Sequence, residues 1–261
     1  MVSTDKRVQF AFDWVETVKQ PILDVFYSLD SFDLKSNNTE VTQADRDTEL
    51  AFRKAIRKSF PSDGIIGEEY SEQNREGVDY TWTIDPIDGT RAFARGVPFF
   101  GTMLSLYQNQ EILFGLVVYP ALGETIYAIK GQGCYWKADH MDVFDKVSVA
   151  NAQELSDATL SFSGEEYFSK ANLGEFIQKL KSEVLFCRTW GDCYGYSLLA
   201  RGKIDIMCDP LLNQWDLVPI KIIVEEAGGK FVNFDGSPTT INSNNALCSN
   251  PTLINKILAL S

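Results

Sequence analysis

One short segment constrains this chain more than any other feature of its sequence. Residues 82–84 (Trp-Thr-Ile) are strand formers, and Asp85 and Pro86 follow them directly. Because proline has no N–H to give to a sheet, we expect the strand to end at Asp85. The Asp85 carboxylate would then lie at the carboxyl end of a strand, at the edge of the sheet.

The residues after this strand favour a site for a metal ion and a phosphate group. Asp88 precedes Gly89 and Thr90, where we predict the start of a short helix that runs to Gly96. Free backbone N–H groups would lie within one turn of two carboxylates. Mg²⁺ prefers oxygen ligands and keeps positions open for water and phosphate, and a helix N-terminus suits a phosphate. The alternative is that Asp85-Pro86 opens a turn and Asp88 caps a helix.

Other carboxylates lie at the predicted ends of secondary-structure elements. Asp209-Pro210 ends a second predicted strand, and Asp216 stands at the start of a predicted helix. Glu68 follows an apolar run, and Asp45 lies near the start of another predicted helix. For Asp45 alone, a helix cap or a solvated acidic first turn is the favoured interpretation. Together these carboxylates are more numerous than helix capping requires, and they indicate a metal site.

The composition limits the classes of partner. The chain of 261 residues has a net charge of −12 and a pI near 4.6. This charge disfavours nucleic acid or an anionic membrane as the main partner. Residues 1–20 carry charges throughout, and no later run approaches a membrane span, so we expect a cytoplasmic protein. We expect a single unit with two halves, 1–145 and 146–261.

The cysteines and the single histidine argue against several kinds of structural and catalytic site. The five cysteines form no Cys-x-x-Cys pair, so neither a disulfide framework nor a zinc site is indicated. His140, the only histidine, lies in a polar segment that we predict to be a loop. A single histidine in this setting disfavours Ser-His-Asp and Cys-His catalysis.

Hydrophobic periodicity and turn residues give a coarse order of elements. The pattern predicts a long first helix bent at Pro21 and, after residue 98, an antiparallel meander. The predicted helices span residues 5–28, about 45–60, 167–181, 194–201 and 217–227, and the predicted strands span 101–107, 112–119, 124–129, 184–187, 204–208 and 231–234.

Three motifs resemble those of the inositol monophosphatase superfamily. They are Gly-Glu-Glu at 67–69, Ile-Asp-Pro-Ile-Asp-Gly-Thr at 84–90, and Trp-Asp at 215–216 followed by Glu-Ala-Gly-Gly at 226–229. The resemblance runs from about Val41 to Gly229. It implies an α/β fold, a layered αβαβα sandwich of the inositol monophosphatase and fructose-1,6-bisphosphatase type. It also implies a Mg²⁺-dependent, lithium-sensitive phosphatase that usually forms a homodimer.

The resemblance also implies roles for individual residues. Glu68, Asp85, Thr90 and the carbonyl of Ile87 would hold a first Mg²⁺, and Asp85, Asp88 and Asp216 a second. Glu68 would help to hold a weaker third ion, which gives two to three ions per site. The catalytic residues would be Glu68, Thr90 and Asp45, with Asp45 orienting water. Gly89 and Thr90 would offer N–H groups to the phosphate, and Lys35 would lie in a loop that closes over the metals, unless it is only a solvated loop charge.

Three segments are similar to the histidinol-phosphatase branch of this superfamily: residues 87–93, 100–102 and, above all, 188–196. Asp192 stands where inositol monophosphatases have small neutral residues. Histidinol phosphate carries an ammonium and an imidazole, so carboxylates at Asp192 and Asp209 would favour it over inositol, which offers only hydroxyls. Asp209 distinguishes poorly between these two substrates, because the resemblance implies that relatives use an acidic residue at this position to bind substrate hydroxyls.

The sequence allows alternative roles for Asp192 and Arg91 and alternative functions for the chain. Asp192 could be an N-cap for the following helix, and Arg91 could be a contact at the rim of the site or a solvated charge. The favoured function is a Mg²⁺-dependent phosphomonoesterase that converts histidinol phosphate, a small phosphate monoester, to histidinol. The alternatives are an inositol-1-monophosphatase, a phosphatase of broad specificity, and a non-catalytic regulatory member of the superfamily.

Overall fold

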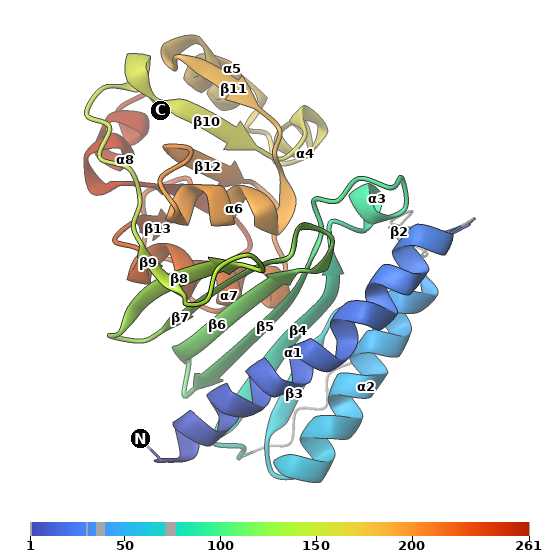
Figure 1. Cartoon of the computed structure of the whole chain (residues 1–261). Coiled ribbons are helices and arrows are strands. Elements are labelled where there is room, and N and C mark those ends of the chain that lie inside the picture. The colour runs from blue at the N-terminus through green and yellow to red at the C-terminus, as the bar shows by residue number, and fades with distance from the viewer. Residues whose placement is uncertain (1, 30, 35–39, 71–76, 261) are drawn as a thin grey trace.

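The structure is a computed structural model that describes residues 2–29, 31–34, 40–70 and 77–260. Helices and sheets alternate in layers, which confirms the predicted αβαβα sandwich (Figure 1). Lys35 lies outside the described residues.

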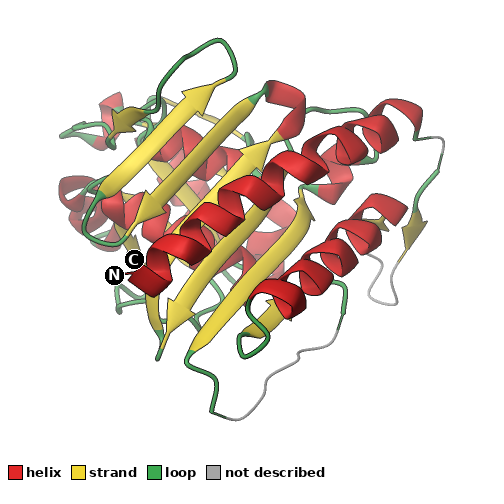
Figure 2. Cartoon of the chain, turned by 60° about the horizontal axis from the view of Figure 1, so that its bottom comes forward, coloured by secondary structure: helices red, strands yellow, loops and turns green. Residues whose placement is uncertain are grey.

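The first layer consists of two helices, α1 (Val2–Ser28) and α2 (Gln43–Ser59). They cover one face of a seven-stranded sheet (Figure 2). The order of its strands is β3 (Gly64–Gly67), β4 (Tyr80–Asp88), β5 (Gly101–Gln108), β6 (Glu111–Tyr119), β7 (Glu124–Ile129), β8 (Gly133–Ala138) and β9 (Asp145–Val147).

The middle layer consists of α6 (Asp192–Ala200) and α7 (Gln214–Glu226). Beyond it lies a five-stranded sheet, and the outer helices are α4 (Glu165–Lys170), α5 (Gly174–Glu183) and α8 (Pro251–Leu258). The order of the strands in this sheet is β11 (Phe186–Arg188), β10 (Thr159–Phe162), β12 (Ile206–Asp209), β14 (Ala246–Ser249) and β13 (Lys230–Val232). Short elements complete the chain: β1 (Asp33–Leu34), β2 (Glu40–Val41), α3 (Thr90–Phe93), and the 3₁₀ turns η1 (Pro120–Leu122) and η2 (Leu155–Asp157).

The apolar core is divided by the sheets into three clusters. Successive side chains of a strand point to opposite faces, so Leu104 and Leu106 pack under α1 and α2, while Met103 packs toward α7. The third cluster lies between the five-stranded sheet and α4, α5 and α8.

The structure corrects several predicted boundaries. The strand β4 does not end at Asp85 but continues to Asp88. Helix α3 ends at Phe93, and the chain reaches Gly96 in turns. The helix predicted over 167–181 is two helices, because Asn172 adopts a left-handed φ of 58° between them. The strand predicted over 184–187 is β11, which begins two residues later.

Candidate active site

Two parallel strands bring Glu68 and Asp85 to the same edge of the first sheet. Strand β3 pairs with β4 in parallel, and its last residue, Gly67, lies opposite Ile84. Glu68 and Asp85 are the next residue of each chain. They therefore lie side by side, Glu68 just after β3 and Asp85 within β4, and they line the same pocket.

A bulge in β4 explains why this strand tolerates a proline. The register with β5 shifts between Asp85 and Asp88, so Pro86 stands where no ladder hydrogen bond is required. The backbone N–H of Ile87 instead donates to Oδ1 of Asp85 at 2.9 Å, and the Thr102 hydroxyl donates to the Pro86 carbonyl at 2.8 Å. The bulge places Asp85 and Asp88 near one point.

Helix α7 supplies the third carboxylate of this cluster. Asn213 is its N-cap, and the Asn213 N–H donates to Oδ2 of Asp216 at 2.9 Å in a capping box. Carboxylate oxygens of Asp85, Asp88 and Asp216 lie within 4.8 Å of one another.

The electrostatics of this cluster fit a bound cation. Burial and the charge of Asp216 raise the pKa of Asp88 to about 7, and burial and Glu68 raise that of Asp216 to about 7. Burial and neighbouring carboxylates also raise the pKa of Asp85 well above its ordinary value. Oxygen ligands that repel one another are the donor set that a hard cation binds, and a cation would offset this repulsion.

Asp45, Ile87 and Thr90 meet at the other side of the cluster. The Thr90 hydroxyl lies 2.9 Å from the Ile87 carbonyl and 3.4 Å from Oδ1 of Asp45. The second oxygen of Asp45 caps α2 by accepting from the N–H and hydroxyl of Thr42. Asp45 is therefore the third helical residue of a capping box whose N-cap is Thr42; it is buried, lines neither pocket, and reaches the site through its contact with Thr90.

Gly89 precedes Thr90 in a conformation that other residues rarely adopt. Its φ is 85°, and a methyl group on its Cα would lie 2.8 Å from the Phe99 carbonyl. This tight turn lets α3 begin directly above the carboxylates.

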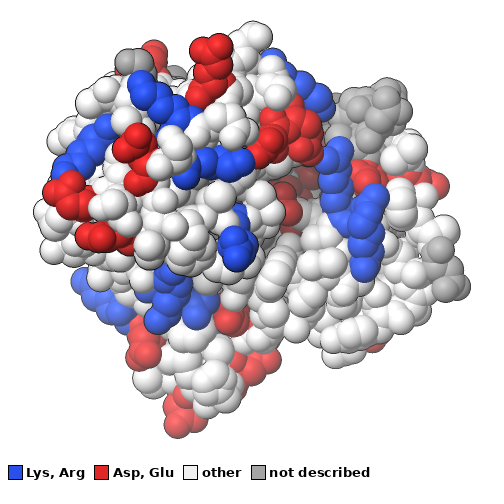
Figure 3. All heavy atoms as spheres, turned by 90° about the horizontal axis from the view of Figure 1, so that it is seen from above, with Lys and Arg blue, Asp and Glu red and all other residues white. Residues whose placement is uncertain are grey.

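Two adjoining pockets open at the cluster, with volumes of about 460 and 490 Å³. Acidic side chains lie in the hollow, and Lys and Arg side chains lie near its rim (Figure 3). Among the described residues that line these pockets, Arg91 is the one basic side chain. The residues common to both pockets are Asp88, Ser163, Tyr167, Asp192, Asn213 and Asp216.

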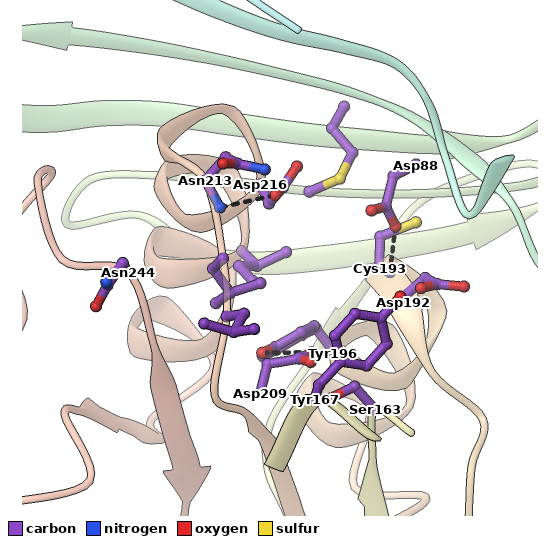
Figure 4. Close-up of a pocket in the computed structure, with 14 residues that line it drawn as sticks. Asp88, Ser163, Tyr167, Asp192, Cys193, Tyr196, Asp209, Asn213, Asp216 and Asn244 are labelled. Carbon is purple, nitrogen blue, oxygen red and sulfur yellow. Dashed lines mark hydrogen bonds between the residues drawn. The ribbon is translucent and has the colours of Figure 1, made fainter. Parts of the chain in front are cut away.

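Asp192 lies in these pockets as the first residue of α6. Gly191 is the N-cap, so the N-cap alternative for Asp192 is wrong. Asp192 has a left-handed φ of 54°, and its Oδ2 lies 3.2 Å from where a methyl group on Gly89 would stand. The next residue, Cys193, donates its N–H to Oδ2 of Asp88 (Figure 4). Desolvation and Asp88 raise the pKa of Asp192 while Arg91 lowers it, and the residue remains open to solvent.

Asp209 lies deeper, at the end of β12. It accepts a hydrogen bond from the Tyr196 hydroxyl at 3.2 Å (Figure 4). Burial raises its pKa to about 7, with Ser163 and Tyr196 opposing the rise and Asp192 adding to it.

Arg91 belongs to an ion-pair cluster at the rim. Its Nε donates to Glu40 at 3.1 Å, and Arg95 binds the other Glu40 oxygen at 3.0 Å. Nη1 of Arg91 also lies 3.6 Å from Oε1 of Glu166 in α4. Arg91 therefore connects α3 with α4 across the pocket. Arg91 thus lies at the rim with its side chain half exposed, and its contact with a substrate stays a prediction.

Sequence reasoning missed several residues that shape the site, including Thr42, Asn213, Tyr196 and Ser163. Two of them carried a signal, because Thr42 and Asn213 each precede an acidic residue by three positions, the pattern of a capping box. Tyr196 and Ser163 come from a helix and a strand end that only the tertiary fold brings to Asp209.

The fold and the acidic pocket define a class of protein. Residues 4–261 match the inositol monophosphatase family, and the chain belongs to this family as a phosphatase, a phosphoric monoester hydrolase. The chain is 34% identical over 254 residues to a protein named histidinol-phosphatase from Chlorobaculum parvum, with 97% of this chain and 95% of the relative covered.

A second relative and a solved structure agree with this assignment. A histidinol-phosphatase from Mycobacterium tuberculosis is 35% identical over 204 residues, 78% of either chain. The structure of an IMPase from Thermotoga maritima superposes with a TM-score of 0.87 at 28% identity and covers 98% of this chain and 96% of its own. Within the part of the chain that the structure describes, no helix is long and apolar enough to cross a membrane.

Proposed function

We propose that this phosphatase hydrolyses histidinol phosphate to histidinol and inorganic phosphate in a Mg²⁺-dependent reaction. The observation that carries the proposal is the position of Asp192, whose carboxylate lies against Gly89 at the turn before α3. Relatives named histidinol-phosphatases at 34% and 35% identity support it.

The described residues would hold the ions in the following way. Glu68, Asp85, Thr90 and the Ile87 carbonyl would bind one Mg²⁺, and Asp85, Asp88 and Asp216 a second, with Glu68 contributing to a weaker third. Bound Mg²⁺ supplies the positive charge that lowers the pKa of a water molecule and neutralises phosphate oxygens. The N–H groups of Gly89 and Thr90 would bind the phosphate, and Asp45, through Thr90, would orient the attacking water. This water would add to phosphorus as the ester P–O bond breaks, and the proton that it loses would pass to the departing alkoxide, which leaves as the alcohol.

The distance between the charged groups of the substrate suits Asp192. In histidinol phosphate the ammonium is attached two carbons from the ester oxygen, so a phosphate bound at Gly89 and Thr90 places it close to Asp192. The imidazole would then extend into the deeper pocket toward Asp209. Charge-assisted hydrogen bonds to both groups are stronger than those to neutral hydroxyls.

A second candidate is the hydrolysis of inositol 1-phosphate or of a range of sugar phosphates. The buried Asp209, oriented by the Tyr196 hydroxyl, favours this candidate because such a carboxylate accepts hydrogen bonds from substrate hydroxyls.

A comparison of substrates tests the proposal. kcat/KM with Mg²⁺ should be measured on L-histidinol phosphate and inositol 1-phosphate with one enzyme preparation. A preference of about a hundredfold for histidinol phosphate, about 2.7 kcal/mol of transition-state binding, is expected. Comparable rates would instead favour the second candidate, and release of phosphate unaffected by EDTA would contradict the role of the metal.

Other properties implied by the resemblance belong to the same proposal. They are two to three Mg²⁺ per site, inhibition by lithium, a homodimer, and a cytoplasmic location. Sedimentation of the full chain tests the homodimer, and titration with LiCl at fixed Mg²⁺ tests the inhibition.

A further inference from the structure

We propose that Glu49 and Arg53, which lie outside the pockets, are positioning residues that fix the backbone carrying Glu68 and so set the affinity for Mg²⁺. The inference rests on the proposed role of Glu68 as a metal ligand. It assigns a function to a buried ion pair on α2 that lines neither pocket.

The Glu49 carboxylate holds the chain directly after Glu68. The side chain is completely buried, and its Oε2 accepts the N–H of Glu69 at 2.7 Å. Its Oε1 accepts the N–H of Tyr70 at 3.3 Å. These two N–H groups belong to a segment that follows β3 outside the ladder, so Glu49 takes the place of a strand partner for them.

Arg53 completes this contact from the next turn of α2. Its Nε donates to Oε1 of Glu49 at 2.7 Å, and its Nη2 donates to the Tyr70 carbonyl at 2.8 Å. The arginine therefore compensates the buried charge of Glu49 and binds the same loop. Because both partners are buried, loss of either leaves an uncompensated group in the interior.

Gly67 shows how closely the carboxylate approaches the loop. A methyl group on Gly67 would lie 2.3 Å from Oε1 of Glu49. The glycine before Glu68 is thus required by the contact with Glu49, and the loop has little room to move toward α2.

The same helix positions both sides of the site. Asp45 and Glu49 are four residues apart on α2, and both are completely buried. Asp45 faces Thr90, while Glu49 holds the Glu68 loop. A rigid helix thereby sets the distance between these two parts of the metal site.

The experiment measures Mg²⁺ binding to the full chain by calorimetry, together with the Mg²⁺ dependence of activity. Glu49→Gln and Arg53→Lys are expected to raise the Kd for Mg²⁺ by about tenfold or more, the typical effect of removing a residue that supports a metal ligand. At saturating Mg²⁺, kcat should return to within about threefold of the wild-type value, because no group of the pocket is lost.

Asp63→Asn is the matched control. Asp63 is a buried carboxylate that binds an arginine with both oxygens, at 2.7 and 2.8 Å from Arg7, and lies at the opposite end of β3. This variant should lower the melting temperature without changing the Kd for Mg²⁺. Equal effects of Glu49→Gln and Asp63→Asn on the Kd, or a change below twofold in both Glu49→Gln and Arg53→Lys, would overturn the proposal.

Two further variants keep the result decisive. If Glu49→Gln does not fold, Arg53→Lys, which retains the charge, decides by the same criterion. Glu68→Gln separates the two proposals: if it weakens Mg²⁺ binding and Glu49→Gln does not, only the positioning role fails. If Glu68→Gln leaves the Kd unchanged, the proposed ligand set itself is wrong.

Discussion

Thr90 and Asp45 are forty-five positions apart in the sequence, yet the Thr90 hydroxyl lies 3.4 Å from Oδ1 of Asp45. The other carboxylate oxygen of Asp45 caps α2 through Thr42. One side chain thus connects the start of a helix to the candidate active site, and its two contacts can be separated by mutation.

Asp45→Asn should lower kcat by about a hundredfold, since removal of a group that orients a reacting water costs this much in other enzymes. Thr42→Ala is the comparison, because it removes the hydroxyl contact to Asp45 but keeps the carboxylate. It should cost about 1 kcal/mol of stability and leave kcat nearly unchanged. Steady-state kinetics and urea unfolding of both variants provide the measurement. Equal losses of kcat would mean that Asp45 acts only as a cap.

Asp85→Asn should abolish turnover and leave the fold intact. Asp85 is 2% exposed and faces Glu68, Asp88 and Asp216, so the neutral amide relieves repulsion in the metal-free protein. We expect a higher melting temperature without Mg²⁺ and a smaller rise when Mg²⁺ is added. Thermal unfolding with Mg²⁺ and with EDTA checks both effects. An active Asp85→Asn enzyme would contradict the proposed metal site.

The stability of the metal-free protein should fall as the pH rises from about 4 to about 7. Asp88 and Asp216 have pKa values of about 7 in the folded protein, raised mainly by burial and by neighbouring carboxylates, against about 3.9 for an unfolded aspartate. The folded state therefore holds these protons more tightly, and it loses that advantage as the pH passes through this interval. Mg²⁺ should accordingly stabilise the protein more at pH 8 than at pH 5.5.

Thermal unfolding across this pH range, with Mg²⁺ and with EDTA, checks this prediction. In Asp216→Asn one of the repelling charges is absent, so the EDTA curve should be flatter. A gain in stability between pH 4 and pH 7 that is the same with Mg²⁺ and with EDTA would be inconsistent with it.

Asp192→Asn should reduce kcat/KM for histidinol phosphate by at least about tenfold, or 1.4 kcal/mol, and affect inositol 1-phosphate much less. Asparagine is the suitable replacement because it tolerates the left-handed φ of 54° at this position, whereas alanine would add backbone strain. Asp192→Gly serves as a second variant that relieves the strain. Parallel losses on the two substrates would remove Asp192 from the specificity residues.

Individual strands and helices followed from the sequence because their determinants are local, whereas the layered arrangement was expected from the resemblance to the inositol monophosphatase superfamily. The strands after residue 98 and the helix predicted over 217–227 each carry their own periodicity and turn residues. The strands β5, β6 and β7 lie within one residue of their predicted bounds, and α7 begins three residues earlier than predicted. The break at Asn172 was also visible, since Asn172 and Gly174 interrupt the apolar spacing, but a single helix was predicted across it.

The end of β4 could not be predicted from local rules. A proline normally ends a central strand. Here the shift in register between β4 and β5 removes the need for an N–H at Pro86. That shift depends on the pairing with β5, a separate strand later in the chain. Asp192 is a similar case. Its left-handed conformation and its approach to Gly89 depend on the packing of α6 between the two sheets, which no spacing in the sequence encodes.

Two tasks proposed for the pocket, metal binding and selection of the substrate, are carried by different carboxylates. Asp85, Asp88 and Asp216 come from β4 and from α7, which packs on the first sheet, whereas Asp192 and Asp209 come from α6 and from β12 of the second sheet. The proposed metal ligands and the proposed selectivity residues therefore come from different strands and helices, although α6 and α7 share the middle layer. Substitutions at Asp192 or Asp209 would therefore alter the groups proposed to recognise the alcohol and leave the proposed metal ligands in place, so selection for a new alcohol could act on one side of the cleft.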